Sequence, residues 1–368
     1  MCYGRTMWPE QLTPLFESAV TVEYASLTRS GVPICVPTTP YVGNNYNTLD
    51  VSTGLTYPAK AERARRNPKV CLLYGDPIGC RLPDPPVVMV QGFASVRDSD
   101  IQVNTDRYVK LTLSKLPAAY KGKPRFALRM MPWYFARIWI EITPIRIYQW
   151  EARTLQKEPL TYAVGDSVTI PSSDPAPVGK PPPPWIDPPA SWQDAADAVT
   201  STGDGYLCDI TTVDGDGFPV CQPVAGVERN HYGFSFTLGR GALPIKPGSA
   251  CATFHTHPDD FTGQQNRTFV GRVVAVGDLA FAVDGSALTS KDTASAEDMT
   301  HGEDTASAED IPENLTVHFQ VDRVLGDWSL AGNQVAMSID FLRKGIKLRP
   351  RLRDEAARRG QPVPKVRL

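Results

Sequence analysis

The 368-residue sequence has no uninterrupted apolar run near the length of about 18 residues that a membrane-spanning helix needs. It also has little excess of charge, because 38 Lys and Arg face 40 Asp and Glu. These two features argue against a membrane partner and against a surface devoted to nucleic acid. The N-terminus lacks the basic and apolar regions of a secretory signal, so a cytoplasmic location is expected.

Motifs for disulfides and metals are also scarce. The seven cysteines include no Cys-x-x-Cys pair, so we expect buried thiols and neither a disulfide framework nor a zinc site. There are five histidines. His255 and His257 alternate as on a strand and would face one side, where such a pair can bind zinc, copper or haem iron. No third ligand is apparent nearby, so an ordinary strand-end pair is favoured and no metal site is predicted.

Proline is abundant, and its position suggests how the chain is divided. Of the 34 prolines, eight fall within residues 175–189. Such a run favours polyproline II, a semi-rigid spacer between domains. We therefore predict a first domain over residues 1–155, a linker over 156–190, a second domain over 191–342 and a basic tail over 343–368.

Two segments carry charge of one sign. Residues 292–313 hold eight acidic residues without Lys or Arg and repeat DTASAED, which predicts a disordered insertion. The tail after residue 342 holds ten Lys or Arg. It is expected to be solvated, with docking to an acidic partner or to the acidic insertion as alternatives. Nucleic acid is not the expected partner, although such a tail could contact phosphates.

The remaining sequence is rich in short strand signals. Strands are predicted over residues 20–28, 33–37, 48–52, 69–74, 87–96 and 136–148 of the first half. A short helix is predicted before residue 20 and another before residue 205, the second with Ser191 as its N-cap. Many short strands with a single helix among them indicate a small barrel.

The two halves also repeat each other. GVPIC at residues 31–35 matches GFPVC at 217–221. Further matches follow in the same order: residues 52–54 with 237–239, 58–60 with 244–246, and Cys71 with Cys251. The first copy has AERARRN between Lys60 and Pro68, where the second has nothing. The second copy has therefore lost a basic helix, and the copies cannot be equivalent in function.

The start of that helix is a candidate anion site. The strand ending in Ser52 and Thr53 leads to Pro58, which suits the first position of a helix, and then to Lys60. Free backbone amides and the helix dipole favour an anion at such a helix start. The two hydroxyls and the ammonium group could add hydrogen bonds and charge. These residues therefore predict a phosphate site.

The order of these elements resembles the pyridoxamine-phosphate-oxidase-like, FMN-binding split-barrel family. The resemblance runs through ASLTRSGVPICVPTTPYV, NTLDVSTG, YPAKAERARRNPKVCLLYGDP and VVMVQGFASV, and closes with IWIEITPIRIYQW. It implies a mainly β chain of two tandem split β-barrels, six-stranded and of Greek-key type, with short helices. The second copy is the degenerate one.

The resemblance also implies a cofactor and its contacts. FMN is the expected cofactor and deazaflavin is the alternative, and haem is less expected than either. The phosphate candidates are Ser52, Thr53 and Lys60, followed by Arg65 and Arg66, whereas Pro37, Thr38 and Thr39 would lie against the isoalloxazine ring. Family members form dimers with the cofactor between subunits. Two barrels in one chain would form an intrachain pseudo-dimer, and a homodimer is also possible.

The function implied is that of an oxidoreductase that transfers hydride between the flavin and a small organic substrate. The cofactor supplies the reactivity in such chemistry, so no catalytic acid or base is forced, and the catalytic residues stay unknown. The alternatives are a non-catalytic protein that binds flavin, deazaflavin or haem, and a degenerate interaction module. The second of these would act through the acidic insertion and the basic tail.

Overall fold

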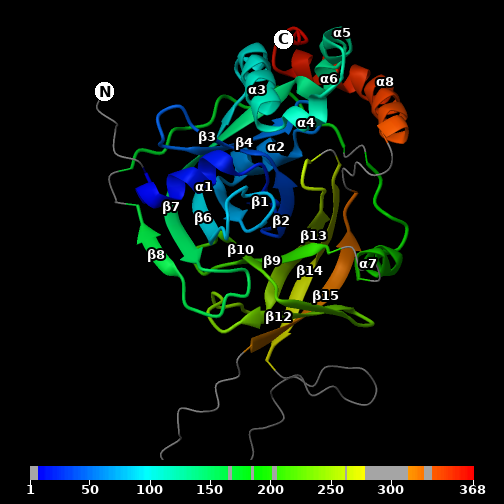
Figure 1. The fold of residues 1–368 in the computed structure, drawn as a ribbon. Coiled ribbons are helices and arrows are strands. Elements are labelled where there is room, and N and C mark those ends of the chain that lie inside the picture. The colour runs from blue at the N-terminus through cyan, green and yellow to red at the C-terminus, as the bar shows by residue number, and fades with distance from the viewer. Residues whose placement is uncertain are drawn as a thin grey trace, which may run out of the picture.

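A computed structural model describes residues 7–164, 168–183, 186–200, 205–261, 263–277, 314–326 and 334–368. The predicted acidic insertion lies outside these residues. Two antiparallel sheets pack against each other, and most helices gather at one end of the molecule, on the first sheet (Figure 1). Among the described residues, no helix is both long and apolar enough to cross a membrane.

The first sheet has the strand order β2-β1-β5-β6-β7-β4-β3, with β8 added to β7. Its strands are β1 (Val22–Leu27), β2 (Pro33–Thr38), β3 (Pro40–Val42), β4 (Leu49–Gly54), β5 (Lys69–Tyr74), β6 (Val87–Arg97), β7 (Arg137–Trp150) and β8 (Leu160–Ala163). The helices of this half are η1 (Glu10–Leu12), α1 (Thr13–Ser18), α2 (Ala59–Arg66), α3 (Ile101–Lys115), α4 (Pro117–Tyr120), α5 (Arg125–Arg129) and α6 (Pro132–Phe135).

The second sheet repeats this order as β10-β9-β13-β14-β15-β12-β11. Its strands are β9 (Leu207–Val213), β10 (Pro219–Pro223), β11 (Gly226–Arg229), β12 (Gly233–Gly239), β13 (Gly248–Thr256), β14 (Gln265–Val276) and β15 (Asn314–Val324). Helix α7 (Trp192–Thr200) precedes them, and the Ser191 hydroxyl accepts hydrogen bonds from the amides of Gln193 and Asp194, as an N-cap does.

The predicted fold class is confirmed, with more strands than the six expected for each barrel. The sheets have eight and seven strands. In each half the chain turns after β2 or β10 and pairs once more, as β3 with β4 and as β11 with β12. Both sheets also carry a register shift at the same place, between Gln91 and Gly92 in the first and between Val270 and Gly271 in the second.

Strands at the junction carry apolar residues on both of their faces because both faces are buried. On β1 and β5, Tyr24 and Leu72 face the core of the first barrel, whereas Ala25, Cys71 and Leu73 belong to a second cluster between the sheets. Burial on both faces produces near-continuous apolar runs instead of alternation. The segment KVCLLY of β5 is such a run.

Cysteines of the two repeats meet at the centre of this junction. The Sγ atoms of Cys35 on β2 and Cys221 on β10 are 3.8 Å apart, and Cys71 and Cys251 lie in the same cluster. The six cysteines that the structure describes are buried and free, as predicted. Threonines of the second sheet bind the first, because Thr253 and Thr268 donate their hydroxyls to the carbonyl oxygen of Cys35, at 3.0 and 3.1 Å.

The prediction of a solvated basic tail is wrong. Residues 343–358 belong to helix α8 (Gln334–Arg358), which lies against the helical end of the first barrel (Figure 1). Leu348, Leu352 and Ala356 are buried in the core of that barrel. Their spacing of four residues forms one apolar stripe of a helix, which the charge pattern of the tail obscures.

The arginines of this helix are also used internally. Arg351 donates its Nε–H to the carbonyl oxygen of Thr56 at 2.6 Å. Beyond the helix, Arg359 pairs with Asp98 at 3.0 Å and with buried Glu355 at 2.7 Å. The basic charge of the C-terminal segment is therefore neutralised in part by the first barrel.

Parts of the predicted linker also lie on the first barrel. Its residues 160–163 form β8, and Asp174 donates its amide to the carbonyl oxygen of Val96 at 2.9 Å. The linker does not act as a spacer, because the two sheets are in direct contact and bury an apolar cluster between them. Apolar burial outweighs the stiffness of the proline run.

Helix α8 should contribute to stability through its buried stripe. Leu352→Ala is expected to lower the free energy of unfolding by about 2–5 kcal/mol, because it leaves a cavity in the core. Ile346 on the same helix is 73% exposed, so Ile346→Ala should change the free energy of unfolding by less than about 0.5 kcal/mol. Urea unfolding of both variants measures this difference. Equal stabilities would contradict the docked helix.

Candidate functional site

The basic helix α2 lies where the sequence predicted it, directly after β4. Ala61 and Ala64 of α2 are buried in the core of the first barrel. Lys60 and Arg63 are three residues apart and so share another side of the helix. Helix α2 contacts β1 and β6, and the thiol of Cys35 on β2 is an electrostatic neighbour of both cations. The two side chains therefore lie near the junction of the sheets.

Neither cation is neutralised by an acid. Burial, together with the guanidinium groups of Arg137 and Arg63, lowers the pKa of Lys60 to about 7. Arg63 donates its Nε–H to the Ser26 hydroxyl at 2.9 Å, and burial also lowers its pKa. Within the described part of the chain, no carboxylate pairs with either side chain.

A third cation completes this group. Arg137 begins β7, beside Gly54, and is 8% exposed. Its Nη2 donates to the Tyr108 hydroxyl at 2.7 Å, and its guanidinium carbon lies 4.0 Å from the centre of the Tyr108 ring. No ion pair with a carboxylate is found for it in the described ranges either. We call Lys60, Arg63 and Arg137 the cationic cluster.

The predicted hydroxyl ligands differ in their availability. Ser52 and Thr53 are buried on β4. The Thr53 hydroxyl donates to the carbonyl oxygen of Tyr57 at 2.8 Å and so closes the turn that leads into α2. Consecutive strand residues point to opposite faces, so these two hydroxyls cannot both face one ligand. Ser52 is the better candidate, because Thr53 is used locally.

The structure separates Arg65 and Arg66 from Lys60. Arg65 pairs with Asp98 at 2.8 Å and also donates to the carbonyl oxygen of Asp174, and Arg66 is exposed. Arg63 instead joins Lys60, although the sequence analysis did not select it. The helical period of 3.6 residues could have found it, because positions 60 and 63 share a face and positions 60 and 65 do not.

The other predicted contacts lie at the end of β2. Pro37, Thr38 and Thr39 are half-buried, and the first two pair in register with Glu23 and Val22. Strand β2 is at the edge of its sheet and packs against β13 and β14. These residues are therefore at the same junction as the cationic cluster, which agrees with the predicted arrangement but does not test it.

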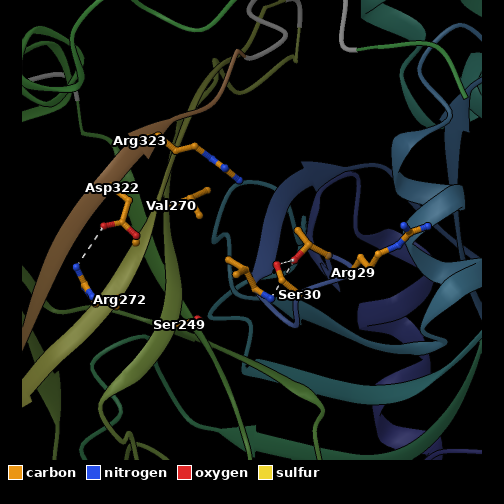
Figure 2. Close-up of a pocket in the computed structure, with 10 residues that line it drawn as sticks. Arg29, Ser30, Ser249, Val270, Arg272, Asp322 and Arg323 are labelled. Carbon is orange, nitrogen blue, oxygen red and sulfur yellow. Dashed lines mark hydrogen bonds and ion pairs between the residues drawn. The ribbon is translucent and has the colours of Figure 1, made fainter.

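A separate cavity of about 670 Å³ lies elsewhere along this junction (Figure 2). The turn between β1 and β2, with Thr28, Arg29 and Ser30, forms one wall, and Arg272 and Arg323 of the second sheet belong to the other. Arg323 points toward the turn, Arg272 points toward Asp322 at 3.9 Å, and Arg29 extends away (Figure 2).

The repeat explains why this cavity is open. The corresponding turn of the second copy has Asp214 and Asp216 where the first has Thr28 and Ser30, and both turns end in a glycine with φ of +79°. Arg146, which matches Arg323 in the strand register, binds Asp216 at 2.9 Å. Thr28 and Ser30 are uncharged and cannot form this ion pair with Arg323. The equivalent contact is therefore not made in the first copy, and the cavity stays open.

Comparisons with known proteins find similarity in structure alone. No family model and no curated protein matches the sequence. General stress protein 26 from Bacillus anthracis matches at 18% identity and a TM-score of 0.28, over 42% of this chain and 96% of its own. A related protein from Clostridium acetobutylicum, described as of the pyridoxinephosphate oxidase family, matches at 14% identity and 0.30, over 42% and 92%.

A FAD-binding protein from Mesorhizobium loti matches at 17% identity and a TM-score of 0.27, over 39% of this chain and 94% of its own. The resemblance seen in the sequence is thus also found among solved structures. Each match covers about the share of the chain that one barrel occupies. Similarity at this level does not support an assignment of function, which depends on the residues of the site.

The uncompensated charge of Lys60 should destabilise the ligand-free protein. Folding lowers the pKa of this lysine from 10.5 to about 7, so the unfolded chain binds its proton more tightly. The free energy of unfolding therefore decreases as pH falls from 10.5 to about 7, and the decrease is complete below about pH 7. Lys60→Met should therefore raise the melting temperature at pH 7 by roughly 2 °C or more, with the gain vanishing near pH 10.5. Thermal melts across this range measure it. A lower melting temperature for the variant at pH 7 would contradict the assignment.

Proposed function

We propose that the first barrel binds the phosphate end of a flavin-type cofactor, FMN or a deazaflavin, at the cationic cluster. The observation that carries this proposal is the group of Lys60, Arg63 and Arg137, which are buried or half-buried and have no carboxylate partner among the described residues. Buried charges of one sign are costly unless they are paired. A phosphate dianion would supply the missing charge.

The chemistry of the donors suits a phosphate. Lys60 offers an ammonium group and Arg63 a guanidinium group, which is planar and forms parallel hydrogen bonds with phosphate oxygens. The Ser26 hydroxyl, bonded to Nε of Arg63, holds that side chain in place. Lys60 belongs to the first turn of α2, where the helix dipole also favours an anion, and Arg63 follows one turn later.

The remaining contacts are inferred from the family resemblance. Pro37, Thr38 and Thr39 would lie along the ring, and Ser52 would add a hydroxyl near the phosphate. A bound flavin would supply hydride transfer, and the protein would bind and orient it beside a small organic substrate. This chemistry would make the chain an oxidoreductase, and no described residue is assigned to the reaction itself.

We expect one such site per chain. Lys246 matches Lys60 in the repeat, but it is exposed and lies directly before β13 without a helix. It therefore has neither the burial nor the second cation of the first copy. This difference makes Lys246 a matched control for Lys60.

The phosphate assignment is tested by titrating FMN and riboflavin into the protein and following flavin fluorescence. We expect saturable FMN binding near one equivalent per chain. Lys60→Ala and Arg63→Ala should each weaken FMN about 10- to 100-fold, because each loses a charged hydrogen bond. Riboflavin lacks the phosphate, so its affinity should change little. Lys246→Ala should bind FMN as the wild type does.

The outcomes separate the parts of the proposal. Equal FMN affinity in wild type and Lys60→Ala would overturn the phosphate site. Binding of a deazaflavin in place of FMN, with the same dependence on Lys60, would keep the site and change the cofactor. FMN that binds but is not bleached by a reduced nicotinamide or by another donor would favour a binding protein over an oxidoreductase.

A further inference from the structure

A second charged group lies at the junction of the sheets and has the opposite sign. Glu23 of β1, Asp209 of β9 and His255 of β13 come together there and are at most 2% exposed. Arg153, Asp76 and His257 flank them. The sequence suggested the histidine pair, but it gave no sign of these carboxylates.

The central contacts are ion pairs between His255 and the two carboxylates. Nε2 of His255 is 3.0 Å from Oε1 of Glu23 and 3.7 Å from Oδ2 of Asp209. Even so, Nε2 of His255, both carboxylate oxygens of Glu23 and Oδ2 of Asp209 are buried and have no hydrogen-bond partner. Buried polar atoms are almost always hydrogen-bonded, so four such atoms held around one point by ion-pair contacts alone favour a ligand between them.

The distances match those between ligands of one metal ion. Ligand atoms about 2.1 Å from an ion are about 3.0 Å apart at a right angle and about 3.4 Å apart at the tetrahedral angle. The two distances from Nε2 of His255, 3.0 and 3.7 Å, correspond to a right angle and to an angle of about 120°, wider than the tetrahedral one. The ion would lie to one side of the line that joins Nε2 of His255 to a carboxylate oxygen. In this geometry an Nε2–H group does not point at the oxygen and donates poorly.

Neighbouring groups hold the ligands in the way that outer-shell residues do. Arg153 donates Nη2–H to Oδ1 of Asp209 at 3.0 Å, which leaves Oδ2 to face His255. The Nδ1 atom of His257 is 3.1 Å from the carbonyl oxygen of Pro258, and its Nε2 faces Asp76. Contacts of this kind fix the orientation of metal-binding side chains.

The buried charges are compatible with a divalent cation. Glu23, Asp209 and Asp76 oppose the single guanidinium of Arg153, which leaves two negative charges buried if both imidazoles are neutral. A divalent cation cancels them. Two protonated imidazoles would also cancel them. Metal and protons are therefore competing occupants.

We propose that Glu23, Asp209 and His255 bind a divalent first-row transition ion such as Zn²⁺, Mn²⁺ or Fe²⁺. Imidazole together with carboxylates suits these ions, whereas Mg²⁺ and Ca²⁺ take oxygen ligands. Asp76 and His257 form an adjoining group that shares His255 and could complete the coordination. The ion would connect the first sheet, through Glu23, to the second.

The position of this site follows from the repeat. Glu23 pairs with Pro37 and Leu73, and Asp209 pairs with Pro223 and Thr253, so the two acids occupy matching places in the two copies. His255 lies four residues after Cys251, where the first copy has Gly75 four residues after Cys71. The two halves thus each contribute a carboxylate at the matching position, and only the second has the imidazole.

The test uses untagged, flavin-free protein. Elemental analysis of the purified protein should find about one transition-metal ion per chain. After removal by a chelator, added Co²⁺ should bind at one equivalent, give visible ligand-field absorption and raise the melting temperature. His255→Gln and Glu23→Gln should abolish the Co²⁺ absorption. His231→Gln should keep it, because His231 is exposed on the surface.

The wild-type cobalt titration decides the question even if the buried variants fail to fold. No saturable Co²⁺ binding and no metal in the purified protein would overturn the proposal and leave a proton-held ion network. Unchanged Co²⁺ absorption in folded His255→Gln would do the same. Because flavin is absent throughout, failure here would not affect the proposed flavin site, and failure of that site would not affect this one.

Discussion

The close packing of β2 against the second sheet is the constraint on which the other features of this protein depend. Cys35 and Cys221 are in contact at its centre, and Thr253 and Thr268 bind the carbonyl oxygen of Cys35. Small thiols and hydroxyls allow strands to approach where larger side chains would hold them apart. The cationic cluster lies beside this contact and belongs to the first barrel, whereas Glu23 meets Asp209 and His255 only because the two sheets pack together.

The duplicated halves keep the same strand order but differ where chemistry is concerned. The first copy has helix α2 with Lys60 and Arg63, and the second has an exposed Lys246. The second copy has His255 where the first has Gly75. A homodimer would repeat each site about its axis. A tandem chain can change one copy at a time, and the junction is consequently asymmetric.

Two groups of opposite charge are buried near one junction without neutralising each other. Lys60 and Arg63 have no carboxylate partner in the described residues, and Glu23 has only the ion-pair contact of its Oε1 with His255. Each group costs stability in the ligand-free protein, because desolvated charge is compensated only by close pairing. Features that lower stability persist where they serve binding. This cost is the physical reason for reading both groups as sites that need a ligand.

Local patterns in the sequence determined the strands, the repeat, the cap at Ser191 and the choice of Lys60, because strand and helix periods and turn residues act over a few positions. The helical period would also have selected Arg63 over Arg65. The sequence could not show that Glu23 and His255 meet, because their contact depends on how two sheets pack. The sequence analysis also misjudged the C-terminal segment, because its charges are prominent in the sequence. The apolar stripe of Leu348, Leu352 and Ala356 is recognised only when the helix is seen packed on the first barrel. Local conformation is encoded by neighbours in the chain, whereas convergence of distant side chains is decided by tertiary packing alone.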